Sequence, residues 1–142
     1  MVSLVSFLER HLAHACRDVE ILAQSPISAG ALKGGTMERA RLFLTAFGRL
    51  KQPGTEQWAL VERIYDVRNV FVHHAGCIST YGHGERLRQF VRRQLGLHEK
   101  NGYISLAAEF CPFVLKTIGT FLDDLATELG ALCDRVLKLD RL

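Results

Sequence analysis

Residues 60–76 read LVERIYDVRNVFVHHAG, and this stretch combines the period of an amphipathic helix with an unusual set of polar side chains. Leu60, Ile64, Val67 and Phe71 recur at steps of four, three and four residues, which places them on one side of an α-helix. We expect that side to face a hydrophobic core. The stretch therefore predicts a long helix at the centre of the fold.

A second side of the same helix is polar. Glu62, Asp66, Asn69 and His73 repeat the same spacing and end at an imidazole. Arg68 lies about 100° around the helix axis from Asn69, and its long side chain can bring the guanidinium alongside His73. We therefore expect a cation, an amide and an imidazole to converge.

These polar residues carry a family resemblance. Residues 68–73, RNVFVH, resemble the Arg-x4-His signature of the HEPN superfamily, including the polar residue directly after the arginine. The lead-in VERIYDV and the small pair Ala75-Gly76 are also similar to that family. HEPN domains are small helical bundles, and many are metal-independent ribonucleases with a composite site built from two protomers. Some HEPN toxins carry a modified tyrosine where this sequence has Ala75, so that mode of regulation is not expected here.

The resemblance implies a catalytic role for Arg68, Asn69 and His73 and no cofactor. His74 and Asp66, which lie on the same helix, are candidate accessory residues. Cleaving RNA without a metal requires a base for the 2′-hydroxyl proton, an acid for the departing 5′-oxygen and a positive charge beside the phosphate. Imidazole exchanges protons near neutral pH, and guanidinium matches two phosphate oxygens at once. One chain offers a single histidine of this kind, so we expect a homodimer that pairs two such surfaces. His74 is the other candidate for the second group.

Two other interpretations compete with catalysis. His73, His74, Cys77 and His83 lie close in sequence, but their spacing matches no established zinc pattern, and we expect no metal site. The stronger alternative is a non-catalytic HEPN-like module that binds RNA or a partner protein. In that case Arg68 and His73 would be buried and paired with Asp66 or Glu62.

Composition favours one ordinary globular domain over residues 1–142, with 48% hydrophobic and 23% charged residues and a net charge of +3. Glu9 and Arg10 interrupt the N-terminal apolar residues before they reach the length of a signal peptide. No stretch approaches the roughly 18 apolar residues of a membrane helix. We therefore expect a cytoplasmic protein that does not enter a membrane.

The remaining periodicity predicts an all-α fold, an up-and-down four-helix bundle of HEPN type with one additional short helix. Apolar steps of three and four residues predict helices over 2–24, 37–50, 55–75 and from about 105 or 111 to the end. Thr36 and Thr55 are the expected N-caps of the second and third helices. Asn101-Gly102 predicts a small β-hairpin. The loop 25–35 is unusually long, and it could equally be a lid over a substrate or a plain connection.

The additional short helix carries the basic cluster of the sequence. Leu87, Phe90, Val91 and Leu95 form its expected inner face, and four arginines spread across its outer face: Arg86, Arg88, Arg92 and Arg93. Such a face can be simply solvated, or it can bind the phosphates of RNA. The predicted function is thus RNA cleavage in a toxin or antiviral defence role, with RNA, a second copy of the chain and an antitoxin or other protein as partners.

Overall fold

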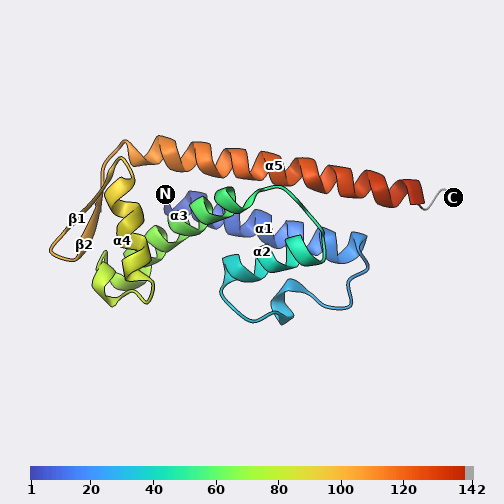
Figure 1. Ribbon diagram of the computed structural model, residues 1–142, viewed down its shortest axis with the longest axis horizontal. Coiled ribbons are helices and arrows are strands. Elements are labelled where there is room, and N and C mark those ends of the chain that lie inside the picture. Colours follow the sequence, from blue (N-terminus) through green and yellow to red (C-terminus); the bar gives the residue numbers. More distant parts are fainter. Residues whose placement is uncertain (140–142) are drawn as a thin grey trace.

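The computed structural model describes residues 1–139 and shows them to be mostly helical, as predicted (Figure 1). The elements, in order, are α1 (Val2–Leu22), a 3-10 turn (Ala29–Ala31), α2 (Thr36–Ala46), α3 (Thr55–His74), a 3-10 turn (Ile78–Thr80), α4 (Gly84–Arg93), β1 (Leu97–Lys100), β2 (Tyr103–Leu106) and α5 (Phe110–Leu139). The four longer helices α1, α2, α3 and α5 share one core, and α4 is the additional short helix.

The core is built from the apolar faces of those four helices. Leu8 of α1, Phe43 of α2 and Phe121 of α5 are almost completely buried. The indole of Trp58 at the start of α3 meets the ring of Phe121 edge-on, with the ring centroids 4.8 Å apart. Burying each such side chain contributes about 1.5–3 kcal/mol, so this contact joins α3 firmly to α5.

The buried face of α3 differs from the predicted one. Ile64 and Val67 are fully buried as expected, but Leu60 is 37% exposed and Phe71 is only half-buried. Other positions on α3 are buried in their place: Trp58, Val61, Arg63 and Val70. The reason is that α3 is contacted by α1, α5 and α4, so its buried face is wider than a single stripe and includes an arginine.

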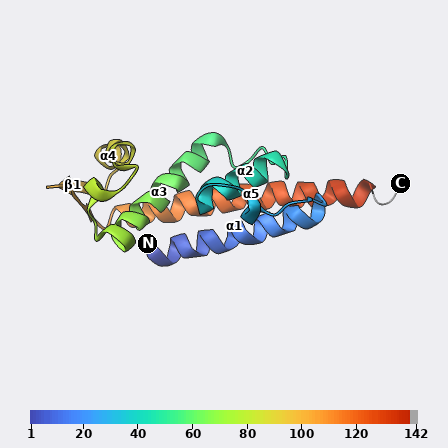
Figure 2. The ribbon, with the colours of Figure 1, turned by 90° about the horizontal axis from the view of Figure 1, so that it is seen from below.

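The up-and-down order predicted for the bundle is wrong. Figures 1 and 2 show α1, α2 and α5 running in one direction along the molecule and α3 running in the other. At the end of α2, Gly48 packs against Val19 in the C-terminal half of α1, whereas Thr36 at its start shares a cavity with Glu9. The long connection between α1 and α2 makes this parallel arrangement feasible, because it returns the chain toward the start of α1.

Two helix starts and one helix end also differ from the prediction. Thr36 and Thr55 are the first helical residues, and the extended residues before them, Gly35 and Gly54, are the N-caps. The Gly54 N–H donates to Gln57 Oε1 at 2.8 Å, which satisfies a free amide at this terminus. Helix α2 ends at Ala46 rather than near Leu50, because the chain turns sharply through Gly48.

The predicted hairpin is confirmed. Asn101 and Gly102 both have positive φ, 54° and 80°, and they join β1 to β2 with Leu97 opposite Leu106. The hairpin and α4 lie at the end of the molecule where α3 finishes, and Ile104 N–H donates to the carbonyl oxygen of Gly76 at 2.9 Å. No helix within residues 1–139 is both long and apolar enough to cross a membrane.

Candidate functional site

A polar cleft of about 870 Å³ runs along α3, and we refer to it as the α3 cleft. One wall comes from α2 and another from the turn that leads into α4. Its charged and hydrogen-bonding side chains include Glu38, Arg41, Glu62, Arg63, Asp66, Asn69, Tyr81, His83 and Arg86. Three of the four residues of the predicted polar side of α3 line this cleft, namely Glu62, Asp66 and Asn69.

Asp66 is the centre of a hydrogen-bond network in the cleft. Its carboxylate accepts a hydrogen bond from Arg63 one turn earlier and another from the hydroxyl of Tyr81 at 2.7 Å. Burial raises the pKa of Tyr81 above its usual value, and the hydrogen bond to Asp66 adds to that shift. Burial lowers the pKa of Arg63, and the charge of Asp66 opposes that change. The sequence interpretation missed Arg63 and Tyr81, although the three-residue spacing of Arg63 and Asp66 is a known signal for a helical ion pair.

Glu62 carries a second group of charges at the mouth of the cleft. Its carboxylate pairs with Arg41 of α2 at 3.1 Å and with Arg86 of α4 at 3.8 Å. The side chains of both arginines are largely exposed. The side chain of Glu62 is only 17% exposed, so the two guanidinium groups compensate a mostly buried carboxylate while their exposed sides stay accessible to another anion.

The three motif residues do not converge as predicted. Arg68 Nη1 donates to Asn69 Oδ1 at 2.9 Å, so the cation and the amide are coupled. The Nε of Arg68 is buried without a hydrogen-bond partner. His73 is exposed and forms no hydrogen bond within residues 1–139. It lies one turn beyond Asn69 on the same side of α3, so it extends the line of the cleft without lining it.

Two further imidazoles surround Tyr81. His74 Nδ1 lies 2.9 Å from Thr80 Oγ1, and its ring meets the Tyr81 ring with the centroids 5.4 Å apart. His83 lines the cleft, and its ring centroid is 5.9 Å from that of Tyr81. The sequence suggested His83 only as a metal ligand, because its position in the α3 cleft depends on the 3-10 turn at Ile78–Thr80.

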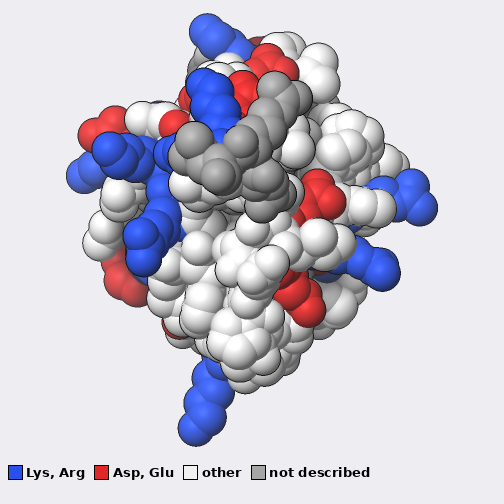
Figure 3. All heavy atoms as spheres, turned by 90° about the vertical axis from the view of Figure 1, so that its right-hand side faces the viewer, with Lys and Arg blue, Asp and Glu red and all other residues white. Residues whose placement is uncertain are grey.

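The basic run on α4 is not one uniform patch. Arg88 is bound within the fold, since its guanidinium donates to Glu99 at 3.0 Å and to Ser79 at 3.0 Å. Arg86 pairs with Glu62, while Arg92 and Arg93 are exposed and form no ion pair within residues 1–139. Leu95 was expected to face inward, but α4 ends before it and it is 73% exposed. At the opposite end of the molecule, positive and negative side chains are interspersed around a largely uncharged centre (Figure 3).

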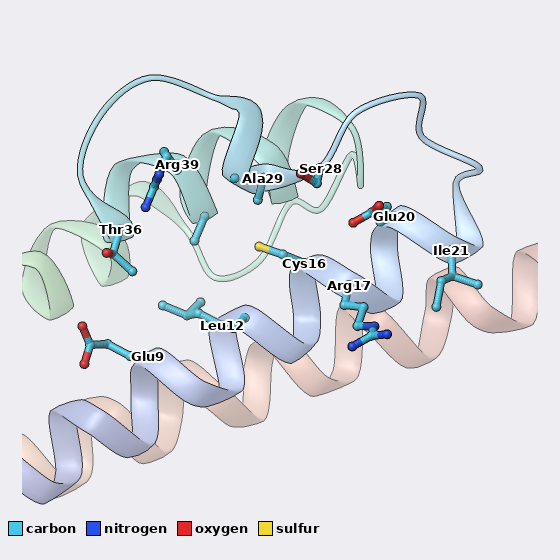
Figure 4. Close-up of a pocket in the computed structure, with 13 residues that line it drawn as sticks. Glu9, Leu12, Cys16, Arg17, Glu20, Ile21, Ser28, Ala29, Thr36 and Arg39 are labelled. Carbon is cyan, nitrogen blue, oxygen red and sulfur yellow. The ribbon is translucent and has the colours of Figure 1, made fainter.

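A second cavity, of about 600 Å³, lies between α1, α2 and the connection that joins them (Figure 4). The thiol of Cys16 and the side chain of Leu12 point into it from α1, and Ala29 faces it from the 3-10 turn. Burial raises the pKa of Cys16 to about 11, so the thiol stays protonated near neutral pH and is a poor nucleophile. The connection at 25–35 therefore covers this cavity.

Within residues 1–139 no three His, Cys, Asp or Glu side chains are grouped closely enough to share a metal ion. The residues considered for a zinc site, His73, His74, Cys77 and His83, are thus not gathered around one point. Comparison of the chain with known protein families, with curated proteins and with solved structures finds no match. Functional assignment therefore depends on the residues themselves.

Proposed function

We propose that this protein is a metal-independent endoribonuclease of the HEPN type, with its site at the C-terminal end of α3. The observation that supports the proposal most directly is the 2.9 Å hydrogen bond from Arg68 to Asn69, which couples a permanent cation to an amide that lines the α3 cleft. His73, one turn further on, is exposed and accessible to a substrate. These are the residue types that cleavage by the 2′-hydroxyl requires.

Each residue has a defined role in the proposal. His73 transfers a proton to or from the reacting oxygens, Arg68 binds the scissile phosphate, and Asn69 orients the guanidinium. The exposed guanidinium groups of Arg41 and Arg86 bind neighbouring phosphates at the mouth of the cleft.

Cleavage of a labelled RNA in the presence of a chelator tests this proposal. The wild type should cut, leave a 2′,3′-cyclic phosphate and spare DNA, which lacks the nucleophile. His73→Ala and Arg68→Ala should each lose about 10²- to 10⁴-fold in rate. Asn69→Ala should lose less, because an amide orients its neighbour but carries no proton.

His14→Ala is the matched control, since His14 is an exposed histidine on α1, away from the cleft. It should cut at the wild-type rate. Wild-type cleavage by His73→Ala, or an intact RNA with wild-type protein under every condition, would show that the catalytic proposal is wrong.

The second proton-transfer group comes either from His73 of a second protomer or from His83 of the same chain. Dilution and mutation separate these two sources. With a composite site, the specific activity falls as the protein is diluted and His83→Ala is active. With a site inside one chain, the specific activity does not depend on concentration and His83→Ala is inactive.

The second candidate function is a non-catalytic module that binds RNA or a partner protein. It is favoured by the pairing of Asp66 with Arg63 and Tyr81, which satisfies the central carboxylate inside the fold. This alternative was predicted with Arg68 and His73 paired to Asp66 or Glu62. The structure shows neither residue paired with those carboxylates. The toxin or antiviral role and the antitoxin partner belong to the catalytic proposal. If they are correct, wild-type protein but not His73→Ala should arrest the growth of a bacterial host.

A further inference from the structure

Helix α5 carries a second apolar row beside its buried face. The buried face consists of Val114, Ile118, Phe121 and Leu125. The second row, which we refer to as the outer stripe, consists of Leu115, Gly119, Leu122, Ala126, Gly130, Cys133 and Leu137. Leu115 and Leu137 at its two ends are 59% and 52% exposed, and a Cβ added at Gly119 or Gly130 would touch nothing. Five of the seven residues of the outer stripe are therefore left exposed, whereas Leu122 and Cys133 are half-buried.

The spacing of the outer stripe keeps it on one side of a straight helix. Its steps are four, three, four, four, three and four residues, which is an eleven-residue repeat used twice. Eleven residues in three turns is close to the natural period of an α-helix, so the stripe drifts little around the axis. From Leu115 to Leu137 it spans about 33 Å at the usual rise of about 1.5 Å per residue. A long, nearly straight contact with another helix is thus geometrically available.

The C-terminal part of α5 also lacks cover from the rest of the fold. No side chain between Leu125 and the last described residue, Leu139, is fully buried. Leu129, Leu132 and Val136 are half-buried, and Figure 1 shows α5 extending beyond the end of α1. Apolar rows that a domain cannot cover itself are typical of protein interfaces.

The outer stripe is complementary to a reversed copy of itself. Ala126 is its midpoint, and residues equally far from Ala126 form matched pairs: Leu115 with Leu137, Gly119 with Cys133, and Leu122 with Gly130. In an antiparallel pair of α5 helices, leucines would meet at both ends and Ala126 would meet its own copy at the centre. Between them, the exposed part of each half-buried Leu122 would lie over Gly130 of the other copy. Such self-complementarity is what a two-fold interface requires.

We propose that two copies of this chain associate through their outer stripes as an antiparallel, two-fold dimer centred on Ala126. This dimer does not depend on the proposed ribonuclease activity. His73 lies at the end of the molecule where α5 begins, so antiparallel pairing places the two copies of His73 at opposite ends of the dimer. A composite site would require an additional interface through α3, whereas a site that uses His83 of the same chain would not.

Cysteine cross-linking tests the centre of the interface. In a background with Cys77, Cys111 and Cys133 changed to serine, Ala126→Cys should form a disulfide-linked dimer under mild oxidation, because the two-fold axis brings position 126 next to itself. Thr127→Cys is the matched control, since it is exposed and adjacent but about 100° around the helix. It should cross-link at least ten times more slowly. Equal cross-linking of the two variants, or of neither, would overturn the proposal.

Sedimentation of the untreated protein provides a second, independent measurement. The wild type should be a dimer at micromolar concentration, Ala126→Glu a folded monomer, and Thr127→Glu a dimer, with folding checked by circular dichroism. A monomeric wild type, or a dimeric Ala126→Glu, would overturn the proposal. RNA cleavage is measured separately on the same variants, so failure of the dimer and failure of the ribonuclease are distinguishable.

Discussion

Arg63 is a charged side chain that the fold buries, with only 8% of its surface exposed, and Asp66 compensates its charge. Removing one partner from a buried ion pair leaves an uncompensated charge in a poorly solvated position. Asp66→Asn should therefore lower the free energy of unfolding by about 3 kcal/mol, which a denaturant titration would measure as a reduced midpoint. The carbonyl oxygen of asparagine can still accept from Tyr81, so the expected change comes from the lost charge beside Arg63.

Glu62→Gln is the control for this prediction. It also removes a carboxylate from the α3 cleft, but the arginines with which Glu62 pairs are largely exposed, so the expected change is less than about 1 kcal/mol. Equal destabilisation by the two substitutions would contradict the central role of the Arg63–Asp66 pair.

Part of this site could be predicted residue by residue. Helical spacing alone placed Glu62, Asp66 and Asn69 on one side of α3, and all three line the same cleft. The partners of these residues could not be predicted, because Tyr81 reaches Asp66 only through the turn after α3. The direction of the Arg68 side chain could not be predicted either, because its rotamer leads to Asn69, one residue away, and not to His73.

At the scale of elements, the arginines of α4 fall into two groups: those that pair within the fold and those that are exposed and form no ion pair within residues 1–139. Arg92 and Arg93 are exposed near the end of the helix, where they can bind phosphates without breaking an internal contact. The double variant Arg92→Gln/Arg93→Gln should weaken RNA binding and reduce the salt dependence of the affinity. For single-stranded RNA the slope of log affinity against log salt should fall by roughly 0.7 for each phosphate that the variant no longer neutralises.

The matched comparison is Arg88→Gln, which removes the same charge from the bound position. It should lower the thermal midpoint by separating α4 from Glu99 of β1 and from Ser79, whereas the double variant should leave the thermal midpoint unchanged. An unchanged salt dependence in the double variant would mean that the outer face of α4 is only solvated.

Helices were predictable as elements because their apolar residues repeat over many turns. The hairpin was predictable because Asn101-Gly102 suits a turn in which both residues have positive φ. The exact ends of the helices were not predictable from the sequence. Gly35 and Gly54 could replace the neighbouring threonines as N-caps without changing the apolar pattern. The two 3-10 turns have no such pattern, so the sequence predicts only loops there.

At the scale of the whole molecule, periodicity shows which residues a helix buries but not which way the helix runs. A short connection would have forced α2 to run back along α1, as the predicted alternating order requires, but residues 25–35 are an unusually long connection. The connection through Ala29–Ala31 is long enough to return to the start of α1 instead. The cavity at Cys16 lies between α1, α2 and this connection.

The uneven burial of α5 has a consequence for amide hydrogen exchange. Between Phe110 and Leu125 the helix is held by fully buried side chains, and beyond Leu125 it is not. Opening of the last turns therefore disrupts little packing, so in dilute protein the amides of residues 126–139 should exchange with deuterium much faster than those of 111–125. Mass spectrometry at two protein concentrations would measure this difference. Equal protection along α5 at low concentration would contradict this prediction. Protection of residues 126–137 that increases with protein concentration would show that a second copy of the chain covers this part of α5.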